Sequence, residues 1–153
     1  IGLFEKFHVF TKAELESRAE IQYETYAKAI NIEAKAMIDI ASKQIIPAVI
    51  KYTKSLADTV NSVTAAGAEA SVQSELLAET SGLLSDTKVA LQKLIDLDKK
   101  SEEVPEGTEL AHYFHEEIVP AMAELRAPVD ALEMIVDKEM WPMPSYGDLM
   151  FEV

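Results

Sequence analysis

The longest patterned stretch of the chain, residues 11–66, reads TKAELESRAEIQYETYAKAINIEAKAMIDIASKQIIPAVIKYTKSLADTVNSVTAA. Apolar side chains recur in it every three or four positions, which matches the 3.6-residue period of an α-helix and places them on one face. The stretch opens with Thr11 and Glu14, the two members of a capping box, in which each side chain bonds a free backbone N–H of the first turn. We therefore expect one long helix over residues 12–66.

Two further stretches, residues 69–101 and 108–139, repeat the same apolar period. Short segments that contain glycine or proline separate the three, so successive helices should be antiparallel neighbours. Pro47, Pro120 and Pro128 fall inside the expected helices, and each removes a backbone donor and should kink its helix. No strand pattern is convincing. The predicted fold class is all-α, an antiparallel bundle of three long, proline-kinked helices.

The two ends of the chain, a leader over residues 1–10 and an extended tail over residues 140–153, are crowded with large apolar side chains. Such segments are expected to pack against a protein surface, because an unpacked segment would expose a contiguous apolar patch. Two interpretations stay open: the tail folds back on the bundle, or the tail and the leader pack against a partner. The candidate packing or assembly residues are Phe4, Phe7, Phe10, Trp141, Pro142, Tyr146 and Phe151.

Composition limits the function. The 153 residues fit one domain and include 14 Lys+Arg against 27 Asp+Glu, for a formal net charge of −13. A charge of that sign repels phosphate backbones and anionic lipids, so nucleic acid and membranes are not expected partners. The absence of cysteine excludes disulfides, thiolate metal sites and cysteine nucleophiles. No apolar run is long enough to span a membrane, and the first residues do not form a signal peptide.

One motif has metal-ligand spacing: Glu109 and His112 are three residues apart on a helical face, and His115 follows one turn later. A di-iron bundle enzyme would need a second Glu-x-x-His, and the chain has only three histidines. Solvated or structural histidines are therefore the simpler interpretation. We expect no catalytic, cofactor or metal site, and Glu109, His112 and His115 remain the best metal candidates that the sequence offers.

The methionines also have a simple interpretation. Met37, Met122, Met134 and Met140 fall mostly on the apolar stripes of the expected helices. Methionine fills irregular gaps between helices, so we expect these side chains in the core rather than on a flexible ligand-binding surface.

Four segments resemble a known family. Residues 3–18 (LFEKFHVFTKAELESR), 30–34 (INIEA), 46–52 (IPAVIKY) and 136–149 (VDKEMWPMPSYGDL) are similar to the C-terminal helical domain of type III glutamine synthetases. The resemblance runs in order from one end of the chain to the other, and the proline- and aromatic-rich ending is its most specific part. Residues 65–110 contribute little to it.

The resemblance implies a parent enzyme that joins ammonia to glutamate with ATP and a divalent metal (Mg²⁺ or Mn²⁺), in a large ring-shaped cytoplasmic oligomer. The active-site residues of that family belong to its catalytic domain, so no catalytic residue is carried over here. The start at Ile1 rather than Met also leads us to expect one domain, residues 1–153, of a longer chain. Its expected partners are the catalytic domain and neighbouring subunits. The alternative is an autonomous acidic bundle that binds a partner protein or a small ligand.

Overall fold

The computed structural model describes residues 2–7, 9–144 and 146–151, and the described part of the chain is helical without any strand. Three long rods make up most of it. The first rod joins α2 (Lys12–Ile40), the π-helical turn η1 (Ala41–Ile45) and α3 (Ile46–Ala65); the second is α4 (Ser71–Ser101); the third joins α5 (Thr108–Tyr113), the π-helical turn η2 (Phe114–Ile118) and α6 (Val119–Glu133). Short helices lie near the ends, α1 (Gly2–Lys6) and α7 (Tyr146–Phe151).

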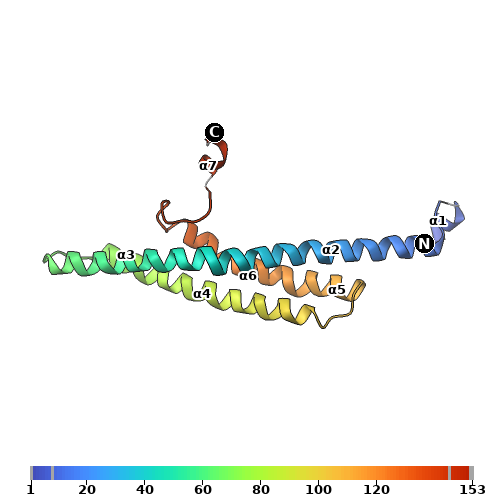
Figure 1. Cartoon of the computed structure of the whole chain (residues 1–153), viewed down its shortest axis with the longest axis horizontal. Coiled ribbons are helices and arrows are strands. Elements are labelled where there is room, and N and C mark those ends of the chain that lie inside the picture. The colour runs from blue at the N-terminus through green and yellow to red at the C-terminus, as the bar shows by residue number, and fades with distance from the viewer. Residues whose placement is uncertain (1, 8, 145, 152–153) are drawn as a thin grey trace.

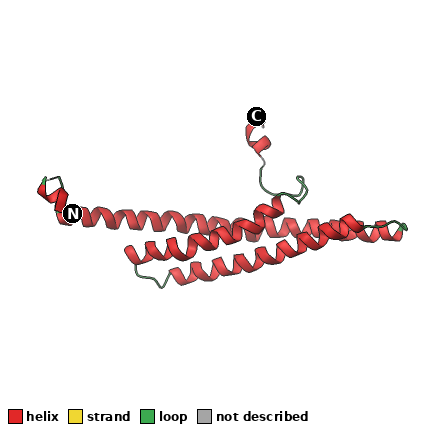
Figure 2. Cartoon of the chain, turned by 180° about the vertical axis from the view of Figure 1, so that it is seen from behind, coloured by secondary structure: helices red, strands yellow, loops and turns green. Residues whose placement is uncertain are grey.

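The three rods lie side by side and alternate in direction, so the predicted all-α fold with three long helices is confirmed (Figure 1). The first rod runs the whole length of the molecule, and its α2 end continues past the end of the other two rods. Seen from behind, loops are confined to the turns between rods and to the two ends of the chain (Figure 2). The tight turn after α3 contains Gly67 at a φ of 83°, a conformation that glycine adopts without strain.

Each of two prolines follows a π-helical turn. In these turns the next backbone N–H bonds to the carbonyl five positions back, from Ile46 to Ala41 and from Val119 to Phe114. A proline is then the second residue of the following helix in both cases. Each proline, which has no backbone N–H to donate, therefore lies where the hydrogen bonding changes from the π-helical to the α-helical spacing. Pro128 lies inside α6 without such a turn, and the bends expected at the prolines stay predictions.

The core consists of two apolar clusters. The larger joins α2, η1, α4, η2 and α6, and the small residues Ala27, Ala34 and Ala41 line its side on the first rod. The smaller joins the start of α3 to the end of the third rod. The largest fully buried apolar side chains are Phe114, Leu91, Leu94, Ile118, Leu125, Leu132 and Val49. Met37 and Met122 pack against the larger cluster as expected, but Met134 is 86% exposed and Met140 is also exposed.

The third rod ends earlier than the sequence predicted, at Glu133 rather than at residue 139. Ile135 N–H bonds to the Leu132 carbonyl, which tightens the last turn. The Asp137 carboxylate then accepts the Glu139 backbone N–H at 2.8 Å, and this local turn competes with continued helix. The tail was predicted to be extended over residues 140–153, but its last part forms the helix α7.

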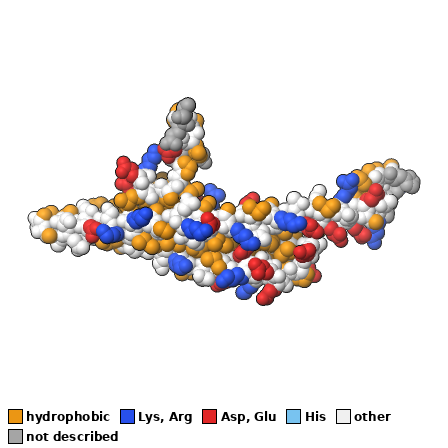
Figure 3. All heavy atoms as spheres, viewed as in Figure 1, with side chains coloured by type: hydrophobic (Ala, Val, Ile, Leu, Met, Phe, Trp, Pro, Cys, Tyr) orange, Lys and Arg blue, Asp and Glu red, His pale blue; other side chains and the backbone are white. Residues whose placement is uncertain are grey.

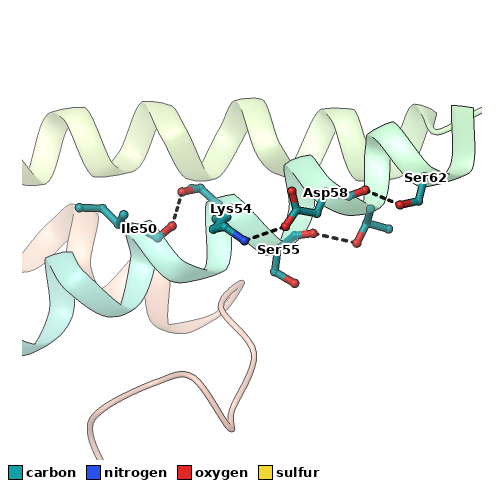
Figure 4. Close-up of polar contacts among 7 residues, drawn as sticks. Ile50, Lys54, Ser55, Asp58 and Ser62 are labelled. Carbon is teal, nitrogen blue, oxygen red and sulfur yellow. Dashed lines mark hydrogen bonds and ion pairs between the residues drawn. The ribbon is translucent and has the colours of Figure 1, made fainter. Parts of the chain in front are cut away.

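The outer side of α3 is occupied by local polar contacts (Figure 4). Lys54 and Asp58 form an ion pair at 2.9 Å, and the Ser62 hydroxyl donates to the Asp58 carbonyl at 2.8 Å. The hydroxyl of Thr59 donates to the carbonyl of Ser55 at the same distance. These bonds satisfy the polar side chains of this face within α3 itself.

Candidate interaction surfaces and an aromatic hollow

The leader folds against the start of α2. The rings of Phe4 and Phe10 lie 6.1 Å apart between centroids, and the Arg18 guanidinium sits 4.7 Å from the centroid of Phe10. The Val9 N–H closes the loop by bonding to the Phe4 carbonyl at 3.0 Å. Phe7 remains 66% exposed, and Phe4 is exposed as well. The leader therefore has its own small apolar contact, and two phenyl rings remain facing solvent.

The predicted capping box begins α2. The Thr11 backbone N–H donates to Glu14 Oε2 at 2.8 Å, and the Glu14 N–H donates to Thr11 Oγ1 at 3.3 Å. The hydrogen bonds from the Thr11 N–H and hydroxyl lower the pKa of Glu14 below its ordinary value. The box fixes where α2 starts, and so sets the direction in which the leader leaves the helix.

The first residues of the tail pack on the bundle. Trp141 is half-buried against the smaller core cluster, which contains Val49, Leu132 and Val136. Its indole Nε1 is buried with no hydrogen-bond acceptor in the described part of the chain. Pro142 is half-buried and lines a hollow of about 410 Å³ against the start of α3. For these two residues, the packing is within this chain.

The end of the tail is different. In Figure 1, α7 stands apart from the three rods. An ion pair at 3.0 Å joins Lys138 to Asp148, but Leu149, Met150 and Phe151 are exposed, Phe151 to 78%. The side chain of Tyr146 lies outside what the structure describes. We call Leu149, Met150 and Phe151 the tail surface, and Phe4, Phe7, Val9 and Ile21, which are likewise exposed, the leader surface.

The metal candidates do not come together as ligands. The His115 Nδ1 is hydrogen-bonded to the Tyr26 hydroxyl at 3.2 Å, and the His112 Nδ1 lies 3.9 Å from Glu116 Oε1. Within the described residues, no group of three or more His, Asp or Glu side chains is arranged to hold a metal ion. Glu109 lies in the first turn of α5, where an acid interacts favourably with the helix dipole.

These histidines instead line a hollow of about 370 Å³ between α2 and the third rod. Its lining is Gln22, Tyr23, Tyr26, Ala111, His112 and His115. The rings of Tyr26 and His115 are tilted by 55°, with centroids 6.4 Å apart. Sequence reasoning missed this hollow because it depends on how α2 lies against α5. The available signal was a pair of tyrosines and a pair of histidines, each three residues apart on a helix.

Comparison with known proteins agrees with the resemblance seen in the sequence. The family model described as "Glutamine synthetase C-terminal domain" matches residues 1–64, which cover the leader and nearly all of the first rod. A type-3 glutamine synthetase from Dictyostelium discoideum is 32% identical over 99% of this chain. The chain belongs to the glutamine synthetase C-terminal domain family. The match to the Dictyostelium enzyme extends past residue 64 to the tail, where the most specific part of the resemblance lies.

Bacterial glutamine synthetases match over a similar extent. The enzyme of Bacteroides fragilis is 28% identical over 94% of this glutamine synthetase C-terminal domain, and that of Butyrivibrio fibrisolvens is 29% identical over 100%. The chain spans about a fifth of the length of these curated relatives. Within the described residues, no helix is long and apolar enough to cross a membrane.

Proposed function

We propose that this glutamine synthetase C-terminal domain is a non-catalytic packing and assembly element. In this proposal it works within a longer, cytoplasmic enzyme that ligates ammonia to glutamate with ATP and Mg²⁺ or Mn²⁺. The catalytic residues and the metal belong to the remainder of that enzyme. The domain's own partners are the catalytic domain and neighbouring subunits, which it contacts through the leader and tail surfaces.

One observation carries the proposal: large apolar side chains are exposed together at the two ends of the chain. Phe7 and Phe151 are 66% and 78% exposed, while the exposed apolar side chains of the bundle, such as Ile32, Val72 and Val89, are scattered along different stretches of its helices. Grouped exposed apolar side chains are typical of surfaces that pack against another protein. The two ends differ in this respect from the outer side of α3, which is covered by polar contacts.

The test uses the full-length enzyme that contains this domain. In it, Met150→Ser combined with Phe151→Ser removes two exposed apolar side chains from the tail surface. Met134→Ser is the matched control, since Met134 is at least as exposed as Met150 but lies in the turn after α6. The proposal predicts that the tail variant loses native oligomer mass, and activity with it, while the control keeps both. Unchanged mass and activity in both variants would contradict it.

The alternative is an autonomous acidic bundle that binds a partner protein or a small ligand, and the aromatic hollow favours it. Under this alternative the 153-residue chain functions without the rest of the enzyme. A source-cell lysate probed with an antibody against the chain distinguishes the two. A band several times heavier than 16.9 kDa supports the glutamine synthetase assignment, and a sole band near that mass supports the alternative.

A further inference from the structure

The aromatic hollow is built almost entirely from groups that attract a cation. Tyr23 and Tyr26 are both exposed, and their ring faces carry the negative end of the aromatic quadrupole. The imidazole rings of His112 and His115 and the amide of Gln22 add nitrogen and oxygen atoms that can accept hydrogen bonds. No Lys or Arg belongs to the lining. The hollow therefore combines π-faces and hydrogen-bond acceptors without a Lys or Arg side chain in its lining.

The two stretches of chain around the hollow are strongly acidic. Residues 12–27 and 102–117 together contain ten Asp or Glu and only two Lys or Arg. Of those two bases, Lys12 is paired with Glu16 and Arg18 covers the ring of Phe10. By contrast, residues 28–54 contain five lysines and two acids. Figure 3 shows this division, with acidic side chains on the part of α2 near the leader and lysines along the middle of the first rod.

The geometry of the hollow is partly fixed in advance. The hydrogen bond of 3.2 Å between the Tyr26 hydroxyl and His115 Nδ1 joins α2 to η2, and it holds the two rings at their 55° tilt. Glu116 lies against His112 at 3.9 Å, so a carboxylate stands next to the lining. A side chain in this hollow would contact the tyrosine and histidine rings, with the Glu116 carboxylate beside His112.

We propose that this hollow is a docking site for an arginine side chain on a partner protein. A guanidinium is planar, stacks on aromatic faces and donates up to five hydrogen bonds, so it matches two tyrosines, two imidazoles and a carboxylate better than a compact ammonium does. The acidic field of the surrounding helices raises the local concentration of a basic segment and orients it. An apolar side chain would use only the rings and gain nothing from that field.

The test titrates the 153-residue chain with N-acetyl-arginine amide, followed by the NMR signals of the tyrosine and histidine rings. The expected result is saturable shifts at Tyr23, Tyr26, His112 and His115, with the ring of Tyr52 on α3 as an internal reference. N-acetyl-lysine amide should bind more weakly, and N-acetyl-norleucine amide should produce no saturable shift. Each tyrosine contributes a factor of about three, so Tyr23→Leu with Tyr26→Leu should weaken arginine binding about tenfold.

The matched control is Glu79→Gln on α4, which removes one exposed acid from a helix outside the hollow's lining and should leave the affinity unchanged. Circular dichroism verifies that every variant keeps its helix content. Equal shifts in the wild type and in the double tyrosine variant would overturn the proposal, and so would equal responses to arginine and lysine. The outcome is separate from the assembly test: if tail variants disrupt assembly and no arginine shifts occur, only the arginine site fails.

Discussion

Leu94 in the middle of the bundle is fully buried, whereas Phe151 near the end of the chain is 78% exposed. The middle of the molecule encloses an apolar core between its own helices, and its exposed apolar side chains are scattered along those helices. Polar side chains on α3 are bonded within that helix. The leader and tail surfaces present apolar side chains without such cover. The three rods therefore contain the apolar core of the domain, while the two ends carry the surfaces that the proposed assembly role requires.

The largest effect should come from the middle. Leu94→Ala removes a fully buried side chain from the larger core cluster and leaves a cavity, so we expect a loss of about 2–5 kcal/mol in the free energy of unfolding. Val89→Ala is the control on the same helix, because Val89 is exposed. It should change stability by less than about 0.5 kcal/mol. Urea denaturation measures the free energy of unfolding of both variants. Equal losses would show that α4 does not bury Leu94 in the core.

The start of α2 should respond more weakly and only locally. Thr11→Ala removes the cap hydroxyl and one half of the capping box, an effect of about 1 kcal/mol on the local helix. We expect faster amide hydrogen exchange in the first turn of α2 and unchanged exchange in α4. Ser17→Ala, which changes an exposed serine inside the same helix, should leave the first turn protected. Faster exchange throughout the bundle would mean that this end is part of the core unit.

The same cap predicts a pH dependence. Bonding to Thr11 lowers the pKa of Glu14 below its ordinary value, so the carboxylate stabilises the folded helix start at pH values above that ordinary pKa. This contribution is lost as the pH falls through the lowered value. In Thr11→Ala the bonds to the hydroxyl are gone, so the pKa of Glu14 should rise toward its ordinary value. An NMR titration of the Glu14 side chain in both proteins measures the shift, and identical curves would contradict it.

A smaller change is expected at Asp98 on α4. Burial is the main cause that raises the pKa of this carboxyl, although Lys35 nearby opposes the shift, and its Oδ1 is buried without a hydrogen-bond partner in the described part of the chain. A raised folded-state pKa means that the charge destabilises the fold at neutral pH, and that stability is gained as the pH falls through that pKa. Asp98→Asn should therefore raise the melting temperature slightly at pH 7 and weaken this pH dependence. Asp96→Asn, at an exposed position that accepts from Gln92, should give no gain.

The smallest effect on stability should come from the tail surface. Met150→Ser with Phe151→Ser changes side chains that the bundle does not cover, so the free energy of unfolding of the isolated chain should stay within about 0.5 kcal/mol of the wild type. Chemical denaturation of the isolated chain gives the comparison. A loss as large as that of Leu94→Ala would place the tail surface in the core and remove the contrast between middle and ends.

Apolar period and turn residues were sufficient to predict the three rods and the capping box, because both depend on local spacing. The early end of the third rod was missed because Val136 keeps the apolar period and is buried, although the turn at Asp137 has already replaced the helix. Met134 fits the stripe as well and is exposed. Periodicity identifies a helix face but does not show whether a neighbour covers it.

The candidate site was less predictable for the same reason. Tyr26 and His115 lie 89 positions apart in the chain, and no local sequence pattern shows that the fold brings them into contact. The π-helical turns before Pro47 and Pro120 were also unforeseen, since a proline indicates a missing donor without showing how the helix adapts. The tail is likewise one apolar segment in the sequence, but in the structure Trp141 packs on the bundle and Phe151 is exposed.

The most direct test of the account is methionine oxidation footprinting of the full-length enzyme and of the isolated chain. Met150 and Met134 are 71% and 86% exposed here, so both should be oxidised readily in the isolated chain. In the assembled enzyme, the account predicts that Met150 becomes protected while Met134 stays reactive. Equal reactivity of Met150 in the assembled enzyme and in the isolated chain would contradict the claim that the ends of this domain are contact surfaces.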